Sequence, residues 1–299
     1  MPSDSPARIF DRNLLLRRRE QAARTPGGHD FLLARVGEDF AERLALIRRS
    51  FPLTVNLGAH NGLVSRQIAG VAGIERIVDT DSSLQALAHC SGLRVLADEE
   101  ALPFKVGSLD LVVSGLALHL VNDLPGTLIQ VRRALKPDGL LLASLLGSET
   151  LKELRQAWLL AETEASGGAS PRVAPFADVR ALGALLQRAG FALPVVDTEI
   201  LTVTYQDPFA LMRELKAMGT SNMLEARRRQ PVTRSLLTRA AEIYAERYAT
   251  DDGRIPATFE ILTLTAWAPD PSQQQPLRPG SAKVRLADAL GAKERKLRN

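Results

Sequence analysis

The sequence predicts a doubly wound α/β domain, in which a mostly parallel, seven-stranded sheet is covered by helices on both faces. Strand-like and helix-like segments alternate over residues 53–146. The strand-like runs are short and apolar, which is typical of parallel strands buried on both faces. The composition is that of a globular protein, with 45% hydrophobic and 24% charged residues among 299, so a disordered or fibrous chain is excluded.

Seven runs have the apolar or β-branched character of strands, and helical periodicity and breaker residues define the segments between them. A Lys136-Pro137-Asp138-Gly139 turn is expected before the fifth strand, and a helical insertion at about 206–250 separates the last two, which resemble a hairpin-like pair. The expected strands are 53–57, 75–78, 94–96, 110–114, 140–145, 198–205 and 258–267. The expected helices are 8–24, 31–49, 63–69, 84–88, 125–135, 149–163, 176–189, 208–218 and 232–248.

The chain divides into three parts by composition. Residues 1–50 form an N-terminal helical segment, residues 51–268 form the α/β domain, and residues 269–299 form a basic tail that we expect to be largely disordered. The longest uncharged apolar run, Leu111–Val121, is much shorter than the roughly 20 residues that a membrane span needs. We therefore expect no membrane span and, because no targeting segment is evident, a cytoplasmic location.

The charge distribution disfavours binding to nucleic acid. The net charge of +4 lies in the termini, because residues 1–50 carry 10 basic and 7 acidic side chains and residues 277–299 carry 7 and 2. The central body is mildly acidic, and aromatic residues make up only 5% of the chain. Nucleic-acid binding needs a clustered basic face and aromatic stacking platforms, so we expect none.

The residues that follow the strands are the candidates for a ligand site, because ligands of doubly wound sheets bind beyond the carboxyl ends of the strands. Gly58 and Gly62 in the first turn let the backbone approach a ligand, although a glycine pair also occurs in plain turns. Asp81 after the second strand can accept both ribose hydroxyls, and Asp98 after the third can accept the adenine amino group. The candidate cofactor-binding residues are Asn56, Gly58, Ala59, Gly62, Asp81, Ser82, Asp98, Glu99 and Ser114.

The spacing of the first turn favours an adenosine that carries no pyrophosphate. A dinucleotide site would need a third small residue near Leu63 or Val64, and the sequence has none there. S-adenosylmethionine is such a ligand. Asp79 reads as a plain turn carboxylate, and the side chains of Glu99 and Glu100 read as solvated, with the backbone at Glu99 near the adenine.

The successive motifs NLGAHNG, DTDSS, ADEEALPF, SLDLVVSGLALHLVNDLP and LKPDG resemble those of class I S-adenosylmethionine-dependent methyltransferases. IFDR, VNDLP, LAETE, MGTSN and PATFEI narrow the resemblance to the family of mitochondrial complex I assembly factor 5 and its bacterial relatives. The resemblance runs from about residue 9 to residue 267. It implies a methyltransferase-like enzyme that modifies a protein side chain, an arginine of a respiratory complex I subunit. The mitochondrial member of the family is credited with hydroxylating such an arginine rather than methylating it, and the sequence leaves the two reactions open for this chain. Eukaryotic members of the family are mitochondrial.

Two positions depart from the family pattern. Asn56 stands where an acidic residue usually ends the first strand, and His60 replaces the middle glycine of the turn. These departures support a further hypothesis, a non-catalytic assembly chaperone with a vestigial cofactor pocket. Methylation of a small carboxylate or quinone-type substrate, as in similar methyltransferases, is the other alternative.

Two histidines are the candidate catalytic residues. His60 and His119 follow the first and fourth strands, which are neighbours in the usual methyltransferase sheet, and a neutral imidazole there can act as a general base. Filling space in the core is the plainer interpretation of both. Asn222, in the insertion before the last strand, is the candidate substrate contact by analogy with this superfold. The remaining two histidines, His29 and His89, are expected to be structural or exposed.

Other reactive or charged residues receive plain interpretations. The sequence holds no His-x-Asp/Glu pair, so we expect no metal site. Cys90 reads as a small residue at the end of a helix rather than a nucleophile. The arginines at 17–19 read as a solvated helix face, with a partner-docking surface as the alternative.

Overall fold

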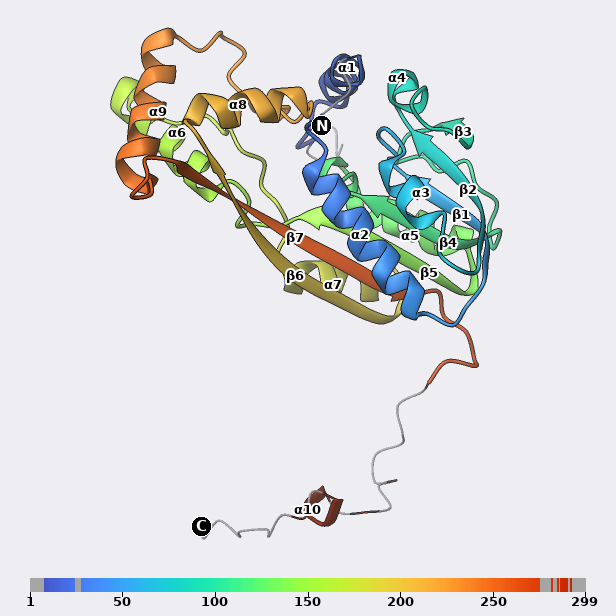
Figure 1. The fold of residues 1–299 in the computed structure, drawn as a ribbon. Coiled ribbons are helices and arrows are strands. Elements are labelled where there is room, and N and C mark those ends of the chain that lie inside the picture. Colours follow the sequence, from blue (N-terminus) through green and yellow to red (C-terminus); the bar gives the residue numbers. More distant parts are fainter. Residues whose placement is uncertain are drawn as a thin grey trace, which may run out of the picture. The chain divides into compact units, whose positions relative to one another are not determined.

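Seven strands form a single sheet in the order β3-β2-β1-β4-β5-β7-β6 (Figure 1). The first five strands are parallel to one another, and β7 runs antiparallel between β5 and β6. The doubly wound, mostly parallel fold is therefore confirmed. The strands are β1 (Phe51–Leu57), β2 (Ile74–Asp81), β3 (Leu93–Leu96), β4 (Leu109–Gly115), β5 (Leu135–Leu146), β6 (Ala192–Tyr205) and β7 (Ile255–Trp267).

The computed structural model describes residues 8–24 and 28–274, together with residues 281, 284, 286–289 and 291. Residues 1–269 form one compact unit, so the N-terminal helical segment belongs to the same unit as the sheet. Residues 270–299 form a second unit, and the expected disorder of the tail concerns residues that lie largely outside the described ones. The helices are α1 (Arg12–Ala23), α2 (Phe31–Leu46), α3 (Leu63–Ile68), α4 (Leu84–Leu87), η1 (Leu118–Leu120), α5 (Leu124–Ala134), α6 (Lys152–Ser166), α7 (Val179–Arg188), α8 (Pro208–Ala217), α9 (Arg234–Tyr248) and α10 (Leu286–Ala289).

The two faces of the sheet carry two separate hydrophobic cores. Alternate side chains of β4 belong to opposite cores, with Leu111 and Val113 on one side and Val112 on the other, because successive side chains of a strand point to opposite faces. Helices α2, α3, α6 and α9 contribute to the first core, and α5 and α7 contribute to the second. Covering both faces leaves the carboxyl edge of the sheet as the place for a ligand.

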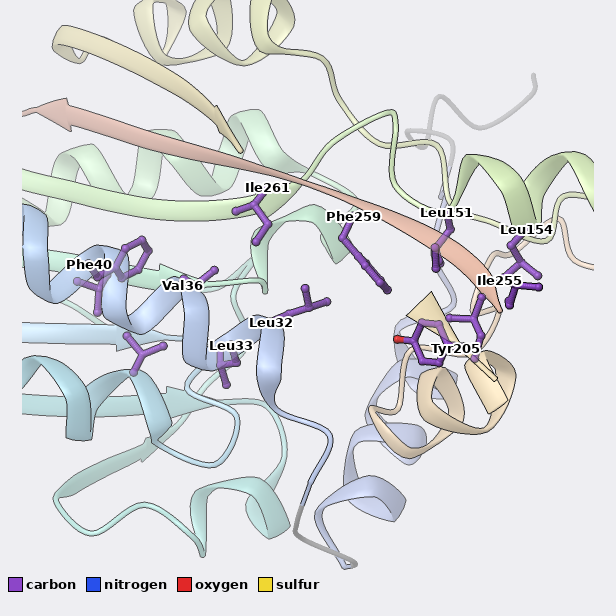
Figure 2. Close-up of a cluster of buried hydrophobic side chains, with 14 of the residues drawn as sticks. Leu32, Leu33, Val36, Phe40, Leu151, Leu154, Tyr205, Ile255, Phe259 and Ile261 are labelled. Carbon is purple, nitrogen blue, oxygen red and sulfur yellow. The ribbon is translucent and has the colours of Figure 1, made fainter. Parts of the chain in front are cut away.

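Helix α2 packs against the first core through one apolar stripe. Leu32, Val36 and Phe40 lie on this stripe at helical spacing, and Phe259 of β7 packs near its start (Figure 2). The phenyl ring of Phe40 is fully buried. The N-terminal segment is therefore part of the hydrophobic core rather than an appendage.

The turn expected at Lys136–Gly139 is a bulge inside β5 rather than a separate connection. Leu109 of β4 pairs with Leu135 of β5, and the next pair joins Leu111 to Leu140. The chain therefore advances two residues in β4 but five residues in β5 between these two pairs. Asp138 has a positive φ of 59°. Pro137 has no N–H to give to a ladder, so the turn residues loop out while the strand pairing continues on either side.

None of the helices that the structure describes combines the length and the apolarity needed to cross a lipid bilayer.

Replacing Phe40 by alanine should destabilise the whole domain if α2 is part of its core. We expect the free energy of unfolding to fall by about 3–5 kcal/mol, the usual cost of deleting a buried phenyl ring. Leu46→Ala, at the exposed end of the same helix where the side chain is 84% accessible, is the control and should change little. Chemical denaturation of both variants decides the point, and similar losses in the two would contradict the packing described here.

Candidate functional site

The end of β1 carries a buried polar cluster in place of the usual acid. The side-chain amide of Asn56 donates hydrogen bonds to Ser65 Oγ at 2.9 Å and to Asp79 Oδ1 at 3.0 Å. Asp79 is the register partner of Asn56 on β2 and is only 2% exposed. The interpretation of Asp79 as a plain turn carboxylate is therefore wrong, because it supplies from the neighbouring strand the negative charge that Asn56 lacks.

The glycine turn after β1 is fixed by close packing. Gly58 has a positive φ of 70°, and a side chain there would bring its Cβ within 2.2 Å of Ala117 Cβ. His60 also has a positive φ, and its backbone N–H donates to Asp81 Oδ2 at 3.0 Å. The imidazole Nε2 lies 3.1 Å from the carbonyl oxygen of Gly115. The turn thus links the ends of β1, β2 and β4.

Asp81 lies at the carboxyl end of β2, where the sequence predicts the ribose-binding acid. Its carboxylate is fully buried and accepts hydrogen bonds from the backbone N–H groups of His60 and Ser83. Ser83 caps α4, and Ser82 beside it is half-buried. Near the carboxyl end of β4, the buried hydroxyl of Ser114 donates a hydrogen bond to the backbone carbonyl of Leu57.

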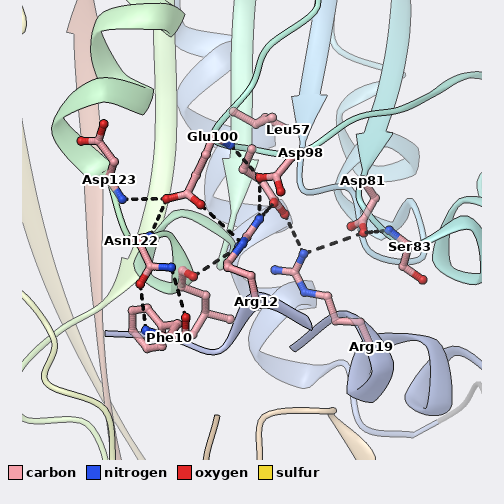
Figure 3. A network of polar contacts seen from close by, with 12 residues as sticks. Phe10, Arg12, Arg19, Leu57, Asp81, Ser83, Asp98, Glu100, Asn122 and Asp123 are labelled. Carbon is pink, nitrogen blue, oxygen red and sulfur yellow. Dashed lines mark hydrogen bonds and ion pairs between the residues drawn. The ribbon is translucent and has the colours of Figure 1, made fainter. Parts of the chain in front are cut away.

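Two arginines of α1 contact the acidic residue that ends β2 and the acidic residues that follow β3 (Figure 3). Arg19 Nη1 lies 2.6 Å from Glu99 Oε1 and 3.8 Å from Asp81 Oδ1. Arg12 Nη2 lies 2.7 Å from Asp98 Oδ1 and also contacts Glu99 Oε2. The predicted acids Asp81 and Asp98 and the buried Glu99 therefore lie together, and arginine side chains of the N-terminal helix contact all three.

The expectation that arginines 17–19 form a solvated helix face is wrong for two of the three. The Arg19 side chain is only 6% exposed, and Arg18 is half-buried and donates to the backbone carbonyls of Ser221 and Asn222. Arg17 is exposed, as expected. Arg12, Leu15 and Arg19 lie at spacings of three and four residues on one helix face, and this periodicity was the available signal.

Glu99 was expected to be solvated, and this prediction is also wrong. The Glu99 carboxylate is fully buried. Burial alone would raise its pKa, but the charges of Arg19 and Arg12 outweigh burial and lower the pKa to about 2. Glu100 is half-buried, and its carboxylate accepts from the backbone N–H groups of Asn122 and Asp123. Both side chains are therefore held by protein partners at the edge of the sheet rather than solvated.

A largely apolar cavity of about 330 Å³ lies beside this cluster and collects the predicted substrate-side residues. His60, His119 and Asn222 all line it, although they come from distant parts of the sequence. Its walls are mainly leucine, methionine and aromatic side chains, and its size is at the lower end of the range for ligand pockets. His29 and Asp30 also line this cavity, which the sequence did not suggest.

His119 lies on η1 and packs edge-on against the ring of Phe176, with ring centroids 5.5 Å apart. Its Nδ1 atom is buried and has no hydrogen-bond partner among the described residues. Burial, assisted by the charge of Arg19, lowers the pKa of His119 to about 3, and the same two causes lower the pKa of His60. Both imidazoles are therefore neutral at physiological pH, and His119 is a weak base with a free hydrogen-bonding nitrogen.

The side chain of Asn222 connects two segments of the cavity wall, at Pro171 and at Leu224. Its amide nitrogen donates to the carbonyl of Pro171 at 2.8 Å, and its amide oxygen accepts from the backbone N–H of Leu224 at 3.1 Å. Arg172 lies in the same wall, stacked 4.6 Å over the ring of Trp158 and paired with the buried Glu162. No motif in the sequence predicts the Arg172–Glu162 ion pair.

The remaining histidine and the cysteine play structural parts. His89 is exposed, and its Nε2 lies 2.8 Å from the carbonyl oxygen of Ala23. Cys90 is buried against Ala59 and Leu87, and burial raises the pKa of its thiol to about 12. Among the residues that the structure describes, no group of three or more histidine, cysteine or acidic side chains is arranged to hold a metal ion.

Comparison with known proteins gives the class and the family. A family model described as a methyltransferase domain matches residues 55–143. The crystal structures of a Bacillus halodurans protein and of Bacillus subtilis YcgJ share the fold, with TM-scores of 0.55 and 0.54 and identities of 16% and 14%. Each covers 78% of this chain and 98% of the solved one. The fold and the matched domain define a methyltransferase-type enzyme whose cofactor is S-adenosylmethionine.

The chain belongs to the family of the mitochondrial arginine-hydroxylase NDUFAF5. It is 41% identical to the mouse protein of that name and 42% identical to the human one, each over 287 residues that cover 94% of this chain and 83% of the relative. It is also 35% identical to a malonyl-[acyl-carrier protein] O-methyltransferase of Gallionella capsiferriformans, over 77% of this chain and 81% of that protein. The resemblance stated from the sequence motifs is thereby confirmed.

The residues at the sheet edge fit S-adenosylmethionine. Asp81 and Asp98 supply carboxylates at the ends of β2 and β3, where ribose hydroxyls and an adenine amino group need acceptors. The buried Oδ1 atom of Asn56 has no partner among the described residues and is a further acceptor at the end of β1. Arg12 and Arg19 hold these acids in the structure, so a cofactor bound at this edge would meet carboxylates that α1 also contacts.

Asp81 and Asp79 form a matched pair for testing the ribose assignment. Asp81→Asn should weaken S-adenosylhomocysteine binding by about 1–3 kcal/mol, because ribose hydroxyls lose a charged acceptor. Asp79→Asn should weaken the Asn56 cluster and lower stability, with little effect on the affinity of the folded protein. Calorimetric titration of both variants measures the two affinities. Equal affinity in Asp81→Asn and the parent would remove Asp81 from the cofactor site.

The low pKa of His119 predicts a pH dependence of stability. The unfolded chain takes up a proton on this side chain near pH 6.5, whereas the folded protein does so only near pH 3. Between these values the unfolded state binds more protons, so the stabilisation is complete above about pH 6.5 and is lost as the pH falls. From pH 7 to pH 5 the parent should lose about 2 kcal/mol more than His119→Gln. Urea denaturation at the two pH values measures this, and equal losses would contradict a buried, neutral His119.

Proposed function

We propose that this enzyme modifies an arginine side chain of a protein substrate, a subunit of respiratory complex I, during assembly of the complex. The family supports the proposal, because the relatives with about 41% identity are named arginine hydroxylases. The absence of a clustered basic face in the sequence agrees with a protein rather than a nucleic-acid partner. The cytoplasmic location expected from the sequence remains part of this proposal.

The observation that carries the proposal is the free nitrogen of His119 in an apolar cavity. A guanidinium group has five N–H donors and no acceptor, so a site for it must offer acceptors. His119 Nδ1 is buried and unpartnered among the described residues, and the pKa of about 3 keeps the imidazole neutral. The carboxylate of Asp30 lines the same cavity and accepts a hydrogen bond from Asn61 at 2.8 Å.

The remaining walls of the cavity suit the rest of an arginine side chain. The leucine and methionine side chains can cover its aliphatic part, and the rings of Trp158, Phe176 and Phe259 can stack on a planar cation. Asn222 and Arg18 brace the loop that closes the cavity, so they position the substrate indirectly. We therefore assign Asn222 to the support of the cavity wall.

Proximity is the main catalytic effect that this site can supply. S-adenosylmethionine, when bound, supplies an electrophilic methyl group. The turn at Gly58–Gly62 and the cavity meet at His60, so a substrate in the cavity is held beside the cofactor edge. His119 orients the incoming group through a hydrogen bond, because its pKa is too low for an efficient general base.

Methylation of a small carboxylate is the second candidate, and Arg172 favours it. The Arg172 guanidinium lines the cavity and is a natural partner for a carboxylate. The 35% identity to malonyl-[acyl-carrier protein] O-methyltransferase supports the same alternative. Arg172 is already paired with Glu162, however, so its charge is neutralised before a substrate carboxylate arrives. We therefore favour an arginine over a small carboxylate as the substrate. A non-catalytic assembly chaperone is the third candidate, in line with the altered residues Asn56 and His60.

Mass spectrometry of the complex I subunits separates these functions. Subunits isolated from cells with and without the enzyme should differ at one arginine, by about 14 Da for a methyl group or about 16 Da for an oxygen atom. His119→Ala should lower the extent of modification by about 10- to 150-fold, the loss expected for one hydrogen bond to a charged group. His89→Ala, at an exposed histidine outside the cavity, is the control. Unmodified arginines in both samples would reject the proposal.

A further inference from the structure

The carboxylates at the ends of β2 and β3 are paired with arginine side chains of α1 in this structure. Asp81 and Glu99 are fully buried, and Asp98 has 46% of its side chain exposed. Arg19 and Arg12 of α1 bind these three acids, at 2.6 Å from Arg19 to Glu99 and 2.7 Å from Arg12 to Asp98. An adenosine at this edge would use the carboxylates of Asp81 and Asp98 as acceptors for its ribose hydroxyls and its amino group. Helix α1 and the cofactor therefore compete for one set of acceptors.

The contact of Arg19 is incomplete. Its Nη1 atom is paired with Glu99, but its Nη2 atom is buried and has no hydrogen-bond partner among the described residues. Leaving a buried donor unpaired costs free energy, so a finished structural ion pair would satisfy both arms of the guanidinium. This cost destabilises the arrangement in which Arg19 contacts Glu99. It therefore reduces the free-energy difference between that arrangement and one in which Arg19 has moved away from the acids.

Helix α1 is tied at its start by hydrogen bonds that do not use these three acids, to Asn122, whose backbone N–H donates to the neighbouring Glu100, and to Met223. The side-chain oxygen of Asn122 accepts from the backbone N–H groups of Ile9 and Phe10 at 2.9 and 2.8 Å. The backbone N–H of Asp11 donates to the carbonyl of Met223 at 2.9 Å. These bonds do not involve Asp81, Asp98 or Glu99. The start of α1 can therefore stay attached while the arginines exchange partners.

We propose that α1 is a lid on the cofactor site, latched by Arg12 and Arg19 to the carboxylates that adenosine requires. Binding of the cofactor releases the latch, and removal of either arginine strengthens binding. The proposal concerns the cofactor alone and does not depend on which substrate the enzyme modifies.

The lid also reaches the substrate cavity. Arg18, on the side of α1 away from the acids, donates to the carbonyl of Ser221 at 2.6 Å and to that of Asn222. Ser221 and Asn222 line the cavity. Release of the latch therefore changes the support of the cavity wall, and the two sites are coupled through one helix.

The test compares arginines on the two faces of α1. Arg12→Gln and Arg19→Gln should bind S-adenosylhomocysteine about 5- to 150-fold more tightly than the parent, the range of ordinary coupling between two sites. Arg17→Gln, at an exposed position on the same helix, should bind like the parent. Adenosine should show the same order of affinities, because the competition concerns the protein carboxylates that bind the adenosine part of the ligand. Calorimetric titration measures all of these affinities.

Hydrogen exchange of the parent gives an independent answer that needs no variant. S-adenosylhomocysteine should speed the exchange of the amides in α1, because the latch is released. Unchanged or weaker binding by Arg12→Gln and Arg19→Gln overturns the proposal, since the arginines would then belong to the bound state. Slower exchange of α1 in the presence of the ligand overturns it as well. If Arg19→Gln does not fold, Arg12→Gln and the exchange measurement decide.

Discussion

The pairing of buried carboxylates with arginines of α1 is the constraint on which the site depends. Glu99 is fully buried yet keeps a pKa of about 2, because Arg19 and Arg12 provide the compensating charge. A buried carboxylate without such partners would be costly, so the folded domain needs either α1 or another group over these acids. The N-terminal helix is therefore part of the site, and its position sets what the cofactor must displace.

The same cations shape the substrate side. The charge of Arg19 adds to burial in lowering the pKa of both His60 and His119, so the cavity beside the cofactor edge contains neutral imidazoles. Arg18 also links α1 to the cavity wall, because it donates hydrogen bonds to the backbone carbonyls of Ser221 and Asn222. A substrate in this cavity meets apolar surface with a few hydrogen-bonding atoms, which restricts the chemistry to positioning and hydrogen bonding.

The sequence predicts the sheet and the strand ends well, because their signals are local. Apolar runs and turns fix β1 to β5, and Asp81 and Asp98 then follow from the rule that ligands bind beyond strand ends. The sequence alone does not predict the burial of Arg19, Glu99 and Asp79, because that burial depends on which helix covers which edge of the sheet. Charged residues are usually exposed, and only the tertiary partner makes a buried one tolerable. The proximity of His60 to His119 follows only from the usual strand order of the methyltransferase sheet, and a substrate-side position for Asn222 follows only from analogy with the superfold.

A crystal structure of the full chain with S-adenosylhomocysteine tests the central claim most directly. The account predicts that the ribose hydroxyls donate to Asp81, that the adenine amino group lies at Asp98, and that the guanidinium groups of Arg12 and Arg19 have left these acids. A structure in which both arginines keep their contacts with Glu99 and Asp98 while the ligand binds at the same edge would contradict the latch. A ligand bound elsewhere would contradict the cofactor site itself.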